Sequence, residues 1–95
     1  LNLLESANDK TSFFYLYYRG LALTKLGRYK EALELLSAAD DAVGEHAAIH
    51  RMLGKIYLNL GDNSQALDFF QKALAIEPGH KATAEIVRQL LSQAN

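Results

Sequence analysis

The sequence repeats itself at an interval of 34 residues, and this feature restricts the possible folds more than any other. When residues 13–46 are aligned with residues 47–80, seven positions are identical, and most of them are small or apolar. The identical pairs are Gly20 and Gly54, Leu26 and Leu60, Gly27 and Gly61, Ala32 and Ala66, Leu33 and Leu67, Ala39 and Ala73, and His46 and His80. Repeats of this length bury a continuous core only by stacking on neighbours. The chain is therefore predicted to contain two copies of one structural unit.

Each unit is predicted to form two helices joined by a tight turn. Apolar residues recur at helical spacing through Phe14, Leu16 and Leu23, and the pattern stops at Gly27. Glycine adopts the left-handed conformation that ends many helices, so Gly27 and Gly61 are expected to be C-terminal caps. We expect five helices near residues 12–26, 29–41, 46–60, 63–76 and 80–93, and no sheet.

The second unit carries clearer helix-boundary signals than the first. Asp62 can accept hydrogen bonds from backbone amides, and Gln65 three residues later completes a pattern that resembles a capping box. The first unit has Arg28 at the position of Asp62 and is expected to be less well capped. Pro78 lacks the amide hydrogen that would continue a helix, so it should end the one before it.

Small residues mark the faces on which the helices are expected to pack. Gly20 and Gly54 lie inside the first helices, where glycine costs about 1 kcal/mol relative to alanine, so close packing is the natural compensation. The second helices carry alanines seven residues apart on one face, namely Ala32, Ala39, Ala66 and Ala73. This pattern favours paired antiparallel helices in close contact.

The second unit resembles a tetratricopeptide repeat. Its matching residues are Leu53, Gly54, Tyr57, Ala66, Phe70, Ala73 and Pro78, and His50 stands where that pattern begins with Trp. The first unit is a divergent copy that keeps Gly20, Ala32 and Ala39. The resemblance implies an all-α fold of antiparallel helix pairs stacked in a right-handed superhelix, with repeats at residues 13–46 and 47–80.

The two ends of the chain are expected to extend this arrangement. Residues 81–95 are predicted to form a capping helix. Val87 takes the position of Leu53, and Arg88 stands where the glycine would let another repeat pack, which suggests that the outer face of this helix is in contact with water. Residues 1–12 are interpreted as a leader or the tail of an upstream helix. The sequence starts at Leu1 without Met, so we expect it to be a piece of a longer multi-repeat protein.

Composition disfavours several classes of function. The net charge is −1, and no run of five like charges occurs, so nucleic-acid binding is not expected. The apolar stretch Phe13 to Tyr18 is far shorter than the roughly 18 residues of a membrane span. No cysteine is present, and no signal-peptide pattern is visible. We expect a soluble chain, with the cytoplasm as the favoured compartment.

Candidate chemical sites find little support in the sequence. His46 and His50 are four residues apart and suggest zinc, but no further ligand stands at a telling spacing. Asp40, Asp41 and Glu45 lack the pattern of a calcium loop and are interpreted as a solvated helix end. No nucleophile elbow or phosphate loop surrounds the serines at 37, 64 and 92. We therefore predict no enzyme activity, no cofactor and no metal.

The aromatic run from Phe13 to Tyr18 allows two interpretations. Without a basic surround it is a weak candidate for stacking nucleic-acid bases. A helix that is hydrophobic on more than one face is usually buried on more than one face, so about half of these rings are expected in the core. The remaining rings are candidates for a partner groove.

The resemblance implies a function in protein binding. In this family the first helices line a concave surface on which partners lie, and that face here carries Phe14, Tyr17, Leu21, Lys25, Arg51, Lys55, Asn59, Glu85 and Gln89. We expect a protein or peptide partner with an acidic group beside an apolar anchor. The alternative is a purely structural segment that self-associates or stacks within an assembly. Binding of a C-terminal carboxylate, as some relatives do, is not supported, since the matching positions carry Tyr17, Leu21, Met52, Ala82 and Ile86.

Overall fold

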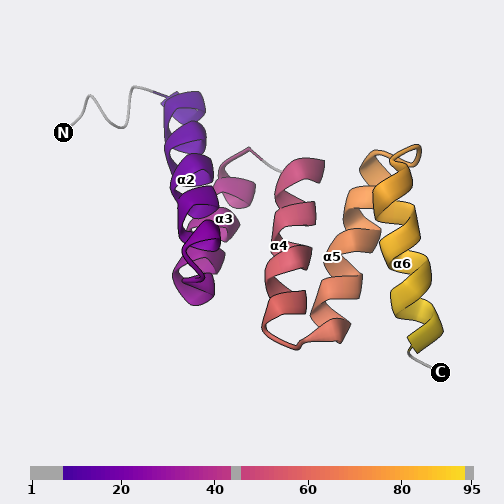
Figure 1. Ribbon diagram of the computed structural model, residues 1–95. Helices are drawn as coiled ribbons and strands as arrows, with labels where there is room; N and C mark the ends of the chain where they lie inside the picture. Colours follow the sequence, from indigo (N-terminus) through magenta and orange to yellow (C-terminus); the bar gives the residue numbers. More distant parts are fainter. Residues whose placement is uncertain (1–7, 44–45, 94–95) are drawn as a thin grey trace. The chain divides into compact units, whose positions relative to one another are not determined.

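The computed structural model describes residues 8–43 and 46–93, which form five α-helices and no β-strand (Figure 1). The helices are α2 (Asn8–Lys25), α3 (Tyr29–Val43), α4 (Ala47–Asn59), α5 (Asn63–Ile76) and α6 (Lys81–Gln93). They belong to two compact units, Leu1–Glu45 with α2 and α3, and His46–Asn95 with α4, α5 and α6. The predicted all-α class and the five helices are confirmed.

The largest difference from the predicted boundaries is at the start of α2. This helix begins at Asn8, four residues before the expected start, so residues 8–12 of the predicted leader belong to it. No glycine or proline interrupts the backbone between Asn8 and Arg19, so the helical hydrogen bonds can continue into this segment. Residues 1–7 lie outside the described part of the chain.

Both hairpin turns end their first helix with the same hydrogen-bond pattern. Gly27 and Gly61 have φ values of 80° and 82°, so both predicted glycine caps are confirmed. After α2, the amide of Arg28 donates to the carbonyl of Leu23 at 2.9 Å, and that of Gly27 donates to Thr24 at 3.0 Å. The equivalent bonds after α4 are 2.9 and 3.1 Å long. These are Schellman motifs, which satisfy carbonyls at a helix end and reverse the chain.

Side chains cap two helices of the second unit. The carboxylate of Asp62 accepts a hydrogen bond from the amide of Gln65 at 3.1 Å, as predicted. His80, before α6, acts similarly, because its Nδ1 accepts from the Thr83 amide at 3.3 Å and lies 2.8 Å from the Thr83 hydroxyl. This cap was not predicted from the sequence, because histidine is not among the residues preferred at that position. His46 precedes α4 without a capping side-chain bond.

In the first unit, α2 and α3 meet at the predicted glycine. A Cβ atom on Gly20 would lie 2.6 Å from Cγ of Leu36, so only glycine allows this approach. Ala32 and Ala39, on the contacting side of α3, are fully buried. The small residues therefore have the packing role that their spacing predicted.

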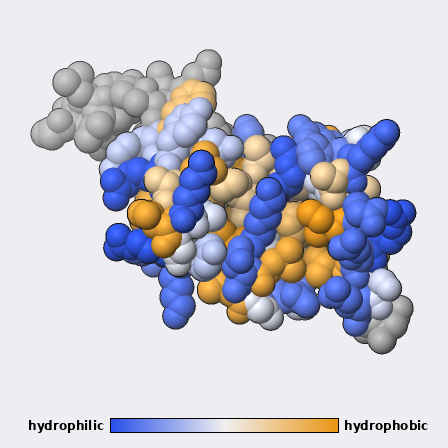
Figure 2. Space-filling model, in the orientation of Figure 1, coloured by the Kyte–Doolittle hydropathy of each residue, from blue (hydrophilic) through white to orange (hydrophobic). Residues whose placement is uncertain are grey.

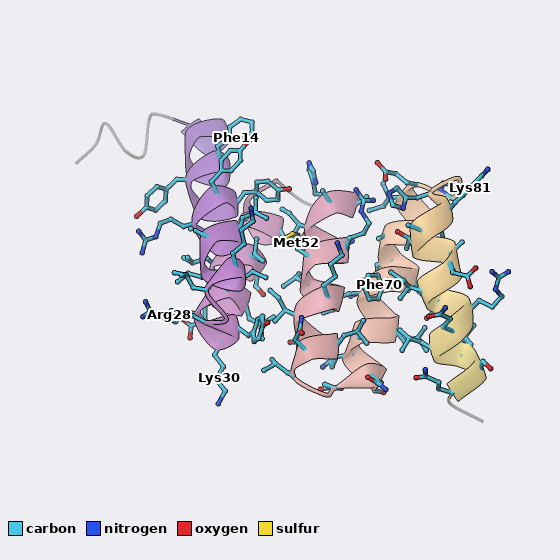
Figure 3. All side chains as sticks on the ribbon, viewed as in Figure 1. Phe14, Arg28, Lys30, Met52, Phe70 and Lys81 are labelled. Carbon is cyan, nitrogen blue, oxygen red and sulfur yellow. The ribbon has the colours of Figure 1, made fainter. Side chains whose placement is uncertain are left out.

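In the second unit, the same contact recurs with a larger partner. A Cβ atom on Gly54 would lie 2.8 to 2.9 Å from the ring of Phe70, which stands 34 residues after Leu36 in the sequence. Phe70 is fully buried, and Figure 3 shows it on α5. Ala66, Val87 and Leu90 form a core cluster with it, so α6 packs on α5 through this cluster. Both repeats thus use one packing scheme.

Helix α6 exposes the side that carries Arg88, and that residues 81–95 cap the repeats stays a prediction. Val87 is buried, whereas Arg88, at the position of the packing glycine, has a side chain that is 73% exposed. Arg88 pairs with Glu85 on the same helix. The stacking of the repeats into a superhelix remains a prediction, and so do the repeat boundaries.

Candidate partner-binding surface

Helix α4 separates a buried row of residues from a polar row. Ile49, Leu53 and Ile56 are buried in the second unit. The predicted site residues Arg51, Lys55 and Asn59 follow each other at intervals of four, which places them along one side of the helix. We call these three residues the α4 row. Figure 2 shows hydrophilic side chains along the visible face of α4, and hydrophobic surface between α4 and α6.

Arg51 is tied to an acidic residue outside its own helix. Its Nη1 donates a hydrogen bond to Oε1 of Glu77 at 2.6 Å, and the two side chains are 22% and 49% exposed. Glu77 directly follows α5 and precedes Pro78. The sequence predicted Arg51 on the partner-facing side of its helix but gave no sign of this contact. The two residues are 26 positions apart, and only the fold brings them together.

The rest of the α4 row is more exposed and less constrained. Asn59 donates from Nδ2 to the carbonyl of Lys55 at 3.0 Å, which orients the amide along the helix. Lys55 is exposed, and no acidic side chain among the described residues pairs with its ammonium group. The row therefore offers one cation held by an internal carboxylate and a second one that faces solvent.

The predicted site residues of α6 are both exposed and interact with each other. Nε2 of Gln89 lies 3.5 Å from Oε2 of Glu85, and Glu85 also pairs with Arg88. The negative charge of Glu85 is therefore balanced within α6. An anionic partner would meet little net repulsion from this helix, because opposite charges at close range cancel at a distance.

The predicted site residues of α2 lie along one side of this helix in the first unit, and the first two of them are aromatic. Phe14 stacks on Tyr18 with the ring centroids 6.1 Å apart, and Tyr17 meets Tyr18 edge-on at 5.3 Å. Leu21 is half-buried and Lys25 is exposed in the last turn. These residues recur every three or four positions and so lie along one side of α2.

The described aromatic rings of α2 are more exposed than the sequence predicted, and the side chain of Phe13 lies outside the described residues. Phe14, Tyr15 and Tyr18 are 49%, 60% and 59% exposed, and Tyr17 is half-buried, so none of these four rings is in the core. The guanidinium of Arg19 lies over the Tyr15 ring, 5.6 Å from its centroid. In the first unit α2 packs on α3, which covers the side that carries Gly20. Hydrophobicity on several sides was therefore a poor guide to burial.

The histidines suggested for zinc have different surroundings. His50 is buried, with its ring 5.9 Å from that of Phe69, whereas His46 is exposed before the start of α4. Within residues 8–43 and 46–93, no three His, Cys, Asp or Glu residues form a group that could hold a metal. Of the three acidic residues interpreted as a solvated helix end, Asp40 is half-buried. The side chain of Asp41 and all of Glu45 lie outside the described part of the chain.

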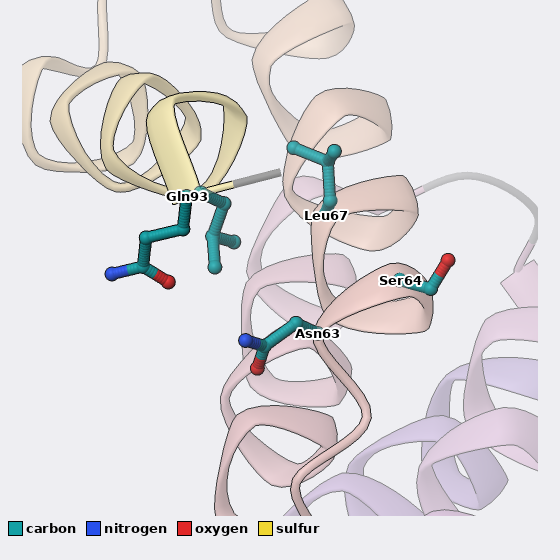
Figure 4. Close-up of a pocket in the computed structure, with 5 residues that line it drawn as sticks. Asn63, Ser64, Leu67 and Gln93 are labelled. Atoms are coloured by element: carbon teal, nitrogen blue, oxygen red, sulfur yellow. The ribbon is translucent and has the colours of Figure 1, made fainter. Parts of the chain in front are cut away.

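A pocket of about 310 Å³ opens between the start of α5 and the end of α6 (Figure 4). Asn63, Ser64 and Gln93 provide its polar groups, and Leu67 and Leu90 provide its apolar walls. None of these side chains titrates near neutral pH, so the lining offers no general acid or base.

Among the described helices, none combines the length and the apolar character needed to cross a membrane.

The chain is similar in sequence to proteins that contain a known repeat. The family model described as tetratricopeptide repeat matches residues 23–93. Protein FlbA of Caulobacter vibrioides is 39% identical over 57 residues, which cover 60% of this chain and 10% of that protein. The photosystem I assembly protein Ycf3 from one strain of Prochlorococcus marinus is 39% identical over 77 residues, or 77% of this chain and 43% of Ycf3.

The fold is also similar to that of a solved structure. A mutant of MamA superposes with a TM-score of 0.76 and 23% sequence identity, over 86% of this chain and 60% of that one. This likeness concerns the fold alone. The chain spans from a tenth to about two fifths of the length of the two curated relatives.

Proposed function

Because the chain belongs to the tetratricopeptide-repeat family, we propose that it binds a segment of another protein along the side chains of its first helices. Relatives with this repeat imply a role as an interaction or assembly scaffold, and the name of one of them, the photosystem I assembly protein Ycf3, states an assembly role for that protein. The partner segment is extended or helical and carries an acidic group beside an apolar anchor. The binding surface consists of the α2 row of Phe14, Tyr17, Leu21 and Lys25, the α4 row, and Glu85 with Gln89.

The observation that supports this proposal most strongly is that α4 has a buried apolar row and a separate polar row. Ile49, Leu53 and Ile56 are buried and hold this helix in the core, whereas Lys55 and Asn59 of the polar row are exposed. The α4 row carries two cations, and the α2 row adds Lys25 and the rings of Phe14 and Tyr17. Cations favour an acidic partner, and exposed aromatic rings supply large contact areas at a low entropic cost.

Mapping a bound peptide tests the proposal directly. Peptides that bind the purified chain are selected from a random-peptide display library, and the strongest is titrated into ¹⁵N-labelled protein. We expect the largest amide shifts in α2, α4 and α6, around the named side chains. Shifts confined to α3 and α5, or to the turns, would exclude the first-helix surface.

A second candidate function is self-association, and the exposed rings of α2 favour it. Phe14, Tyr15 and Tyr18 leave apolar area in contact with water, and such patches often mark protein interfaces. Sedimentation at increasing protein concentration separates the two functions. Self-association predicts a rising molecular mass that Tyr15→Ser and Tyr18→Ser together abolish, whereas a peptide-binding module stays monomeric.

A further inference from the structure

We propose that Glu77 is an internal competitor for the acidic group of the partner, so that an acidic segment binds the α4 row by displacing Glu77 from Arg51. The inference rests on the proposed function and specifies how its acidic partner is selected. The carboxylate of Glu77 already occupies the place on the Arg51 guanidinium, at 2.6 Å, that an incoming carboxylate would take.

The contact between Arg51 and Glu77 leaves hydrogen-bonding capacity unused. It joins one guanidinium nitrogen to one carboxylate oxygen. Arg28 and Glu31, in contrast, form two bonds, of 2.5 and 3.0 Å. A guanidinium presents a planar fork that binds carboxylates best through two parallel bonds. A partner carboxylate that approaches freely can form both, whereas the Glu77 carboxylate, which starts from the end of α5, contacts Arg51 through one bond.

Exchange of the two carboxylates should cost little. Glu77 is 49% exposed, so water can solvate it once it leaves Arg51. Ion pairs in which a charge remains in contact with water contribute modest net stability, and here that charge is the Glu77 carboxylate. The partner also gains a second contact, because Lys55 lies one turn along the same row without an acidic partner among the described residues. A segment with two acidic groups spaced by about 5–6 Å fits both cations.

The test measures the affinity of two probe peptides for the 95-residue chain by isothermal titration calorimetry. The acidic probe is acetyl-Glu-Leu-Glu-Leu-Glu-amide, and the neutral probe has Gln in place of each Glu. We expect Glu77→Gln to tighten binding of the acidic probe by about two- to fivefold, because the competitor is removed. Binding of the neutral probe should not tighten.

Two controls separate competition from a general change of charge. Glu31→Gln removes the same charge from another exposed arginine pair, on α3, and should leave the affinity for the acidic probe nearly unchanged. In an Arg51→Gln background, Glu77→Gln should no longer tighten binding, because no guanidinium remains to be released. Circular dichroism confirms that each variant stays helical.

Several results would overturn the inference. These are an unchanged affinity of Glu77→Gln, an equal gain in Glu31→Gln, a gain that persists without Arg51, or no binding of the acidic probe to either protein. The proposed function survives each of them if a library peptide perturbs the first helices. The proposed function itself would be wrong if the selected peptides bind only α3, α5 or the turns.

Discussion

Gly54 shows how a single residue fixes the distance between two helices. Glycine inside a helix costs about 1 kcal/mol relative to alanine, so α4 is weakened locally by its presence. The ring of Phe70 fills the space that a Cβ atom would need. Close packing thus outweighs intrinsic helix propensity at this position. The sequence indicated close packing at this position, because the same glycine recurs 34 residues earlier as Gly20. The structure adds that Leu36 is the residue packed against Gly20.

We predict that Gly54→Ala lowers the free energy of unfolding by about 1–2 kcal/mol, since overpacking costs more than the gain in helix propensity. The methyl group would stand 2.8 to 2.9 Å from three ring atoms of Phe70. Gly79→Ala is the matched control, because no atom lies within 4 Å of a Cβ at that position. Urea denaturation of the three proteins measures the difference. Equal midpoints for all three would show that the ring yields and that the contact is loose.

At the scale of helices, local signals predicted most ends of the elements. Gly27 and Gly61 ended α2 and α4, Asp62 capped α5, and Pro78 followed the end of α5, because each acts on backbone groups within a few residues. The contact of Arg51 with Glu77 could not be predicted in this way. It depends on where the chain returns after a complete helical hairpin. The exposure of the α2 rings likewise depends on which neighbours cover that helix.

The cap of α5 gives a prediction at this scale. Asp62→Ala removes the acceptor for the Gln65 amide and should lower the free energy of unfolding by about 1 kcal/mol. Asp62→Asn retains a side-chain oxygen at the same place and should lose much less. Thermal unfolding followed by circular dichroism compares the two variants with the unaltered chain. If Asp62→Asn loses as much as Asp62→Ala, the carboxylate contributes through its charge and not through the cap.

At the scale of the whole molecule, the two units have different chemical surfaces. The first unit presents aromatic rings on α2, and the second presents the cations of the α4 row beside the balanced charges of α6. The first surface favours an apolar group of a partner, and the second favours an acidic group. The family and the exposed residue types follow from the sequence. The partner's position on the surface does not, because it depends on contacts that no local pattern encodes.

We propose that the polar side of the first helices binds the partner, so reversal of the charge on that side should weaken binding. Arg51→Glu combined with Lys55→Glu is compared with Lys30→Glu combined with Lys72→Glu, which changes the same charge on the second helices α3 and α5. Affinity for one library-selected peptide is measured at low and high salt. We predict about tenfold weaker and less salt-sensitive binding in the first variant only, with helicity retained in both. Unchanged affinity in the first variant, or an equal loss in the second, would contradict the assignment.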